Sequence, residues 1–251
     1  MGIYANHKER INTGIALLTV VLTVGYIDNF FLMWLFFGGV YILAFQEAVK
    51  LFGVEKDNLL PFAIGLWIVA AIYPYGDDLF VLAGVMYAGA VAYNKNILWR
   101  DFLPFIYPTA GMLFILTMYK EYGVASLIWL LVVVALSDVG AYVVGKTMGK
   151  TKFSPTSPNK TLEGVFGGVL IATFGGMFAG LPIVDMWVGF LVSFGVSVSS
   201  IFGDLFESSL KREAGVKDSG TILPGHGGVL DRIDGYLFGA VVMLILLRGL
   251  V

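Results

Sequence analysis

The chain has 251 residues, of which 58% are hydrophobic and only 14% charged, and its formal net charge is −2. Soluble domains carry about 25% charged residues, so a soluble protein of this composition could not cover its own surface. The net charge alone says nothing about a polyanionic partner, but no nucleic-acid partner is expected. The chain contains no cysteine, which excludes disulfides, thiolate metal sites and a cysteine nucleophile.

Apolar segments follow one another along the chain, most of them near the length of about 20 residues that a membrane helix requires. The nine candidate spans are Ile11–Ile27, Asn29–Phe45, Leu59–Tyr73, Leu79–Tyr93, Phe102–Met118, Ala125–Val144, Val165–Leu181, Met186–Phe206 and Val229–Leu250. Helix-breaking residues such as Leu181-Pro182 separate many of them. We therefore predict an all-α, polytopic membrane protein with about nine transmembrane helices.

The nine spans also predict an organisation and an orientation. We expect residues 1–124, with five spans, to form a scaffold and residues 125–251, with four, to carry the catalytic motifs, without a separate soluble domain. Of the 16 Lys and Arg residues, 14 fall on the side of the N-terminus, and only Lys120 and Arg248 fall on the other. Because basic loops stay in the cytoplasm, the N-terminus is predicted to be cytoplasmic and the C-terminus to lie on the far side.

A charged stripe marks the end of the eighth span. Asp204, Glu207, Ser208 and Lys211 have spacings of three, four and seven residues, so they share one face of a helix. Lys211 and Arg212 could simply extend to the membrane interface. Asp204, however, lies inside the apolar segment, where a charge is costly and usually functional. We expect this face to belong to a site at the cytoplasmic end of the span.

Residues 217–228 surround a histidine with glycines and a proline. The segment begins with Lys217-Asp218, contains His226-Gly227-Gly228 and leads directly into the last span. Glycines let a backbone approach phosphate and turn its N–H groups toward it, and a helix N-terminus favours an anion. We expect a phosphate-binding loop rather than a flexible connector, which would need neither the Lys-Asp pair nor the histidine.

The last span begins with Asp231-Arg232-Ile233-Asp234, whose two carboxylates are three residues apart and face one way. Acids at a helix start can act as caps, but two acids and an arginine exceed what capping requires. Together with Asp204 they form a candidate site for a hard cation. Mg²⁺ suits such a site because it binds few carboxylates and completes its shell with water and substrate phosphates.

Two further regions of the second half carry polar residues. Asp138 interrupts the sixth span and is expected to be buried there, either in a functional role or in a hydrogen bond between helices. The loop after it contains four lysines between residues 146 and 160, together with Ser157 and Thr161. These lysines could hold lipid headgroups or nucleotide phosphates, or could be the ordinary positive charge of a cytoplasmic loop.

Residues 140–147 match the P-loop pattern, with Gly140, Gly145, Lys146 and Thr147 in the required places. That pattern binds phosphate between a strand and a helix of a soluble βαβ unit. Here a membrane span precedes it and a proline-containing loop follows. We therefore predict that this segment is not a nucleotide site.

The residues from Ser208 to Asp234 read SSLKREAGVKDSGTILPGHGGVLDRID. This segment resembles the signature of the phosphatidate cytidylyltransferases, also called CDP-diacylglycerol synthases: S-x-L-K-R, four residues, K-D, and then P-x-H-G-G-x-x-D-R-x-D. The stretches 137–142 and 157–164 are similar to other motifs of that family. The resemblance begins near residue 135, and the first half is similar only in being a series of spans.

The resemblance implies that CTP and phosphatidic acid react to give CDP-diacylglycerol and pyrophosphate. It also implies Mg²⁺, with a second cation such as K⁺, and a homodimer among the lipids of the bacterial inner membrane, with its active site facing the cytoplasm. Asp204 and Asp231 become the first candidates for Mg²⁺ ligands, followed by Asp234, Asp218 and Glu207. The groups expected to bind the two phosphate-bearing substrates, or to close over them, are Lys211, Arg212, Lys217, Arg232, Ser157, Lys160, Thr161, Ser208, Asp138, His226, Gly227 and Gly228.

Two alternatives remain open at this point. The nearer one is a related CTP-dependent enzyme that acts on another lipid phosphate. The other is a membrane transporter, which is disfavoured because the sequence shows no internal repeat of the kind that transporters commonly contain.

Overall fold

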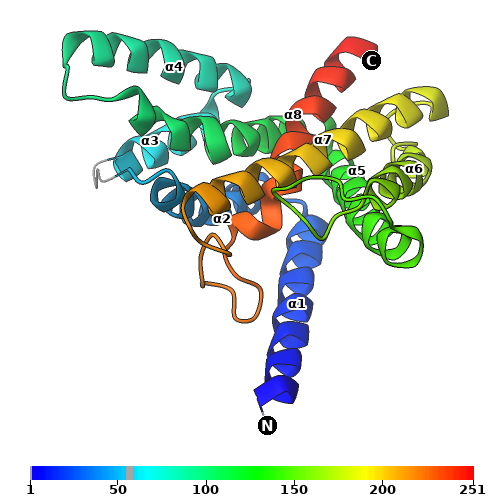
Figure 1. Cartoon of the computed structure of the whole chain (residues 1–251). Helices are drawn as coiled ribbons and strands as arrows, with labels where there is room; N and C mark the ends of the chain where they lie inside the picture. Colours follow the sequence, from blue (N-terminus) through cyan, green and yellow to red (C-terminus); the bar gives the residue numbers. More distant parts are fainter. Residues whose placement is uncertain (1, 55–58) are drawn as a thin grey trace. The chain divides into compact units, whose positions relative to one another are not determined.

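The computed structural model describes residues 2–54 and 59–251, and their side chains from residue 12 onward. Within these ranges the secondary structure is helical, apart from two isolated β-bridges. The helices, labelled in Figure 1, are α1 (Gly2–Ile27), α2 (Phe30–Leu51), α3 (Leu59–Ile72), α4 (Gly76–Tyr93), the short η1 (Trp99–Phe102) and η2 (Phe105–Thr109), α5 (Ala110–Met148), α6 (Leu162–Ala179), α7 (Met186–Glu213) and α8 (Leu230–Leu250). The predicted all-α class is confirmed.

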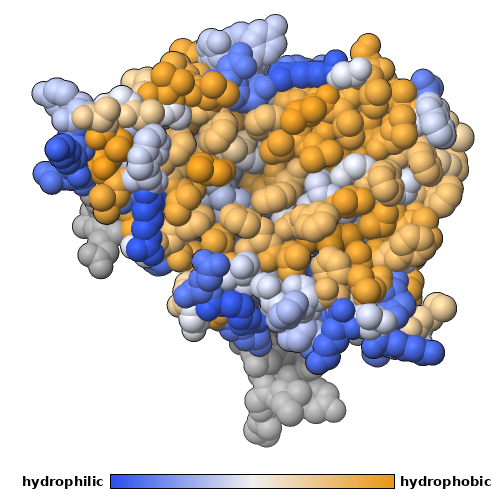
Figure 2. Space-filling view, turned by 45° about the horizontal axis from the view of Figure 1, so that its top comes forward, coloured by the Kyte–Doolittle hydropathy of each residue, from blue (hydrophilic) through white to orange (hydrophobic). Residues whose placement is uncertain are grey.

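Much of the helical structure suits a membrane. Within the described ranges, five segments are long and apolar enough to cross one: Phe30–Leu51, Trp99–Met148, Leu162–Ala179, Met186–Glu213 and Leu230–Leu250. Many large hydrophobic side chains are exposed, and Figure 2 shows a face on which they predominate. Because so large an apolar surface is unfavourable in water, the chain is an integral membrane protein with several apolar helices.

The helices differ in detail from the predicted spans. α2 continues to Leu51 and α7 to Glu213, so that Glu47 and residues 207–212 are helical. α5 is interrupted at Gly123, where φ is 69° and ψ is −172°. Glycine adopts a positive φ at little cost, so a turn forms there, between the predicted fifth and sixth spans.

The chain divides into two compact units, one made of residues up to 116 and 213–233, the other of residues 117–212 and 234–251. In the first, α2 packs against α1, α3 and η2. Its core is aromatic: Tyr41 and Phe45 of α2 are fully buried and lie 5.2 Å from Trp67 and 5.1 Å from Phe105, respectively, between ring centroids. The predicted division of roles at residue 124 stays a prediction.

In the second unit, glycines allow helices to approach closely. A Cβ atom on Gly168 of α6 would lie 2.6 Å from the carbonyl oxygen of Ser137 in α5. One on Gly203 of α7 would lie 2.5 Å from the carbonyl oxygen of Asp234 in α8. Because these helices pack backbone against backbone, the backbone positions that carry Asp138, Asp204 and Asp234 are fixed within this unit.

Candidate active site

The predicted charged face of α7 is present in the second unit. Glu207 is fully buried, and its Oε2 accepts a hydrogen bond from Nζ of Lys211 at 2.9 Å, one turn further along the helix. Asp204 is partly exposed and forms an ion pair with Lys160, from the loop before α6. Both acids of this face therefore have a lysine partner.

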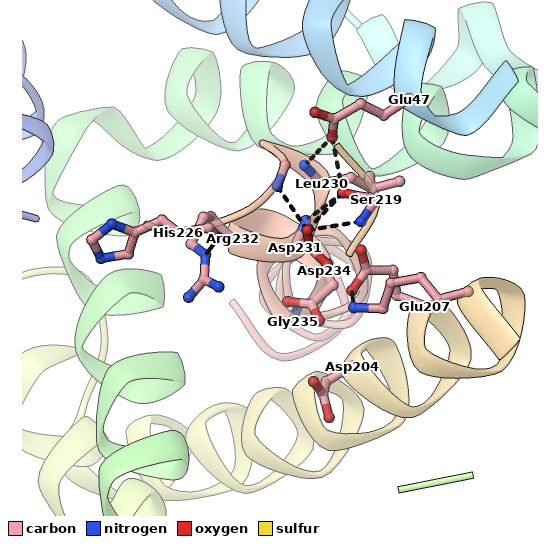
Figure 3. Close-up of polar contacts among 12 residues, drawn as sticks. Glu47, Asp204, Glu207, Ser219, His226, Leu230, Asp231, Arg232, Asp234 and Gly235 are labelled. Atoms are coloured by element: carbon pink, nitrogen blue, oxygen red, sulfur yellow. Dashed lines mark hydrogen bonds and ion pairs between the residues drawn. The ribbon is translucent and has the colours of Figure 1, made fainter. Parts of the chain in front are cut away.

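Asp234 of α8 joins this acidic group (Figure 3). Its side chain lies within electrostatic range of Glu207 and Asp204, and its Oδ1 accepts from the N–H of Gly235 at 2.8 Å. Within the described ranges, no three Asp, Glu or His side chains form a ready metal cage. Mg²⁺ does not need one, since one or two carboxylates with substrate phosphates commonly bind it.

Asp138 is exposed on α5, and the expectation that it would be buried is wrong. In this turn of α5, the residues that contact α6 are instead Ser137 and Gly140, and both are buried. Asp138 lies in electrostatic range of the hydroxyl of Tyr236, as does Asp234. Tyr236, which sequence reasoning missed, is thus flanked by two acids of the second unit.

The lysine-rich loop between α5 and α6 is closed by Glu163. This carboxylate accepts hydrogen bonds from the N–H of Lys150 at 3.1 Å, from the N–H of Thr151 at 3.1 Å and from the hydroxyl of Thr151 at 2.9 Å. At the other end of the loop, Thr161 caps α6 through its side-chain oxygen. The loop is therefore held at both ends, and the side chain of Lys160 extends from it to Asp204.

In the first unit, the loop between α7 and α8 folds around Asp231 (Figure 3). Its Oδ2 accepts hydrogen bonds from the N–H and the hydroxyl of Ser219, both at 2.9 Å, and from the N–H of Gly228 at 2.8 Å. The loop turns tightly at Gly225 and Gly227, whose φ angles are 72° and 84°. Asp231 therefore organises the loop in addition to any role toward substrate.

Glu47 of α2 completes this arrangement, and sequence reasoning missed it. It is only 2% exposed. Its Oε1 accepts from the N–H of Val229 at 3.0 Å, and its Oε2 accepts from the N–H of Leu230 at 2.8 Å and from the hydroxyl of Ser219 at 3.0 Å. The only local signal was a single acid near the end of an apolar segment, which the predicted span had placed in the following loop.

The expectation that the first N–H groups of α8 would face a phosphate is wrong for Gly228, Val229 and Leu230. Their N–H groups already donate to the carboxylates of Asp231 and Glu47. Each backbone N–H is a single donor, so these amides are committed to the protein's own anions. A phosphate bound in this region would have to be held by side chains or by other parts of the loop.

His226 is half-buried beside Gly14 of α1, and its Nδ1 has no hydrogen-bond partner among the residues that the structure describes. Its carbonyl oxygen accepts from Nε of Arg232 at 3.0 Å. The other predicted site residues are half-buried or exposed: Ser157 in the loop before α6, Ser208 and Arg212 on α7, and Lys217, Asp218 and Gly227 in the loop before α8.

The P-loop match at residues 140–147 lies entirely within α5. Gly140 packs against Gly168, and Gly145 packs against Thr161. A continuous helix offers no cradle of backbone N–H groups, because they are bonded within the helix. The segment is therefore helical rather than a phosphate loop, and its inability to bind a nucleotide stays a prediction.

Comparison with known proteins shows similarity over most of the chain, and not only in the segments described above. A sequence model of the cytidylyltransferase family matches residues 8–250. A phosphatidate cytidylyltransferase of Helicobacter pylori (strain J99) is 44% identical over 243 residues, covering 96% of this chain and 91% of that protein. One from Thermotoga maritima is 35% identical over 233 residues, covering 83% and 85%. One from Bacillus subtilis is 49% identical over 123 residues, covering 47% and 45%.

Proposed function

The chain belongs to the cytidylyltransferase family, and we infer that it is a phosphatidate cytidylyltransferase, which converts CTP and phosphatidic acid to CDP-diacylglycerol and pyrophosphate in phospholipid biosynthesis. The observation that carries this inference is 44% identity to a phosphatidate cytidylyltransferase over 96% of the chain. The family match over residues 8–250 includes the ion pairs Lys160–Asp204 and Lys211–Glu207. A reaction between two phosphate-bearing substrates requires charged groups of this kind.

In this reaction, an oxygen of the phosphatidate phosphate attacks the α-phosphorus of CTP. The bond between the α- and β-phosphoryl groups breaks, and pyrophosphate leaves. The phosphatidate phosphate is already ionised near neutral pH, since the second pKa of a phosphate ester is about 6, so no strong general base is required. The site must instead bring two anions together and offset the charge at the reacting phosphoryl group.

Lys160 and Lys211 suit that task because each pairs with a carboxylate, Asp204 and Glu207 respectively. The pairs balance four charges at the edge of an apolar environment, where an unpaired charge would be costly. We propose that both lysines move to phosphate oxygens when the nucleotide binds. Lys217, Arg212 and Arg232 would hold the remaining phosphate oxygens from exposed positions.

We propose Asp204, Asp231 and Asp234 as Mg²⁺ ligands. Carboxylate oxygens are the donors that Mg²⁺ prefers, and Asp231 and Asp234 are three residues apart at the start of α8, hence on one face. Lys160 already places positive charge against Asp204. When bound, Mg²⁺ supplies charge neutralisation and orientation of the phosphates, and a second cation such as K⁺ is part of the same proposal.

We also propose nine spans, with the N-terminus and the catalytic motifs on the cytoplasmic side of a bacterial inner membrane, and a homodimer. The distribution of Lys and Arg supports the orientation. A reporter fused after Val251 should lie on the far side, and one inserted near Thr156 in the cytoplasm. Finding both on the same side would exclude the nine-span arrangement.

The activity is tested with the purified full-length protein, labelled CTP, phosphatidate in vesicles and Mg²⁺. We expect a lipid-extractable CDP product and one pyrophosphate for each CTP consumed. Diacylglycerol in place of phosphatidate is the control, because it lacks the attacking phosphate. A product formed from an isoprenoid phosphate but not from phosphatidate would assign the chain to the related lipid substrate instead.

A further inference from the structure

Glu47 is a buried acid on a part of α2 whose other buried residues are apolar. Its neighbours Ala44, Phe45 and Ala48 are fully buried. Burying a carboxylate is costly unless hydrogen-bond donors replace its hydration. At Glu47 two N–H groups and one hydroxyl do so, and all three come from the segment that leads into α8 (Figure 3).

We propose that Glu47 is a positioning residue for the cytidylyltransferase reaction: it fixes the loop between α7 and α8 and, through Ser219, sets the orientation of Asp231. This rests on the function proposed above for Asp231. Oγ of Ser219 lies 3.0 Å from Oε2 of Glu47 and 2.9 Å from Oδ2 of Asp231. A hydroxyl has one proton and donates to one carboxylate at a time, so a change at Glu47 is transmitted to Asp231.

The glycines of the loop support this arrangement independently. A Cβ atom on Gly228 would lie 2.6 Å from Oε2 of Glu47, and one on Gly220 would lie 2.9 Å from its Cδ. Any other residue at either position would collide with the carboxylate. Glycine at position 220 is therefore explained by the close approach of Glu47, and glycine at position 228 by that of Glu47 together with Ser219 and the backbone of Gly220.

The contact also differs from an ordinary helix cap. A helix N-terminus is commonly capped by the residue directly before it, whereas the N–H groups of Val229 and Leu230 meet a carboxylate 182 and 183 residues earlier in the chain. Glu47 thus ties α2 to a segment that contains Lys217, His226 and Asp231. Its effect on the reaction is expected to reach the substrates through that segment.

Hydrogen exchange of the purified full-length protein, measured by mass spectrometry, tests the anchoring. Glu47→Gln keeps the size of the side chain, but its amide nitrogen can only donate and would face a backbone N–H. Peptides that contain residues 219–231 should exchange roughly 10- to 100-fold faster, the effect of losing a hydrogen bond to a charged acceptor. Gln46→Ala, at the adjacent exposed position, is the matched control and should leave exchange unchanged.

Two further measurements separate positioning from a purely structural role. In Glu47→Gln, kcat should fall about 100-fold, the usual effect of misplacing a reacting group, while the KM for phosphatidate stays near its wild-type value. Binding of Mn²⁺ alone, followed by electron paramagnetic resonance, should weaken in parallel. Faster exchange with an unchanged kcat would overturn the proposal, as would a reduced kcat with unchanged exchange.

Ser219→Ala carries the test if Glu47→Gln fails to fold. It removes the hydroxyl but keeps the backbone contacts of both carboxylates, and should weaken Mn²⁺ binding and lower kcat on the order of tenfold. Wild-type kcat and Mn²⁺ binding in this variant would overturn the proposal. If the wild-type protein itself made no CDP-diacylglycerol, the proposed function would fail, and the exchange and Mn²⁺ measurements would still decide the role of Glu47.

Discussion

Replacing Asp204 or Asp231 by asparagine should abolish activity in both cases but destabilise the protein in only one, because the two carboxylates have different partners. Asp204 pairs with Lys160, and their side chains are 30% and 27% exposed. Ion pairs exposed to this degree contribute about 0.2–1 kcal/mol. We therefore expect the free energy of unfolding of Asp204→Asn to fall by no more than about 1 kcal/mol.

Asp231→Asn should be more costly to the structure. Three donors converge on its Oδ2: the N–H groups of Ser219 and Gly228, and the hydroxyl of Ser219, which it shares with Glu47. An amide oxygen can replace that acceptor, but without its charge. Hydrogen bonds to charged groups contribute about 1.5–3 kcal/mol and neutral ones about 0.5–1.5. The difference of about 1 kcal/mol for each bond predicts a total loss of about 2–3 kcal/mol, because the hydroxyl is shared, and this loss should be confined to the loop before α8.

Both substitutions should have the same effect on catalysis. Each removes the charge that a bound Mg²⁺ would require, and with it several kcal/mol of transition-state stabilisation, which corresponds to a rate loss of roughly 10³-fold. The assay is steady-state turnover over a range of Mg²⁺ concentrations, with thermal unfolding and hydrogen exchange measured on the same preparations. Asp185→Asn is the matched control, because Asp185 only caps the start of α7 and asparagine caps equally well.

Three results would refute this reasoning. A variant that kept more than a tenth of wild-type turnover would exclude its residue as a primary metal ligand. An Asp231→Asn protein that exchanged like wild type before α8 would show that the three hydrogen bonds contribute little. Equal destabilisation by the two substitutions would mean that the pairing of Asp204 with Lys160 contributes more than its exposure implies.

Other substitutions test the surrounding structure. Glu163→Gln should increase hydrogen exchange in the loop before α6 and lower turnover on the order of tenfold. Unchanged exchange in that loop would show that Glu163 does not hold it in place. Gly168→Val should destabilise the protein by about 1–3 kcal/mol through overpacking, seen as a lower Tm, whereas Gly89→Val, with nothing within 4 Å of its Cβ, should not. Replacing Lys120 and Arg248 together by Gln should cost no more than about 1 kcal/mol and leave turnover unchanged. A tenfold fall in turnover would show that the active site lies at the end of the spans that carries Lys120 and Arg248, opposite to the proposed end.

The parts of the site that follow from local spacing could be predicted from the sequence. Residues three and four apart share a helical face, so the grouping of Asp204, Glu207 and Lys211 required only that α7 remain helical past the apolar segment. The P-loop match could be rejected for the same local reason, since an apolar span precedes it.

What the sequence could not show was which groups meet across long separations. Glu47 contacts Ser219, 172 residues later, and no local pattern relates the two. The glycine-rich segment before α8 correctly indicated an anion at the helix N-terminus, but the anions there are the carboxylates of Asp231 and Glu47. A pattern of this kind predicts that negative charge will be bound, not whether that charge belongs to a substrate or to the protein.

The acids of this chain can be sorted by the donors that they meet, and this bears on how a largely apolar protein handles a highly charged nucleotide. Glu47 and Glu163 accept from backbone N–H groups, which cannot move to another partner without unfolding the loop. Asp204 and Glu207 accept from lysines, which have long flexible side chains and can exchange one anion for another. The first pair is therefore suited to hold loops in place, and the second to exchange partners when phosphates and a cation arrive. On this argument, substituting the first pair should increase hydrogen exchange and thereby slow turnover, whereas substituting the second should reduce turnover with little change in exchange.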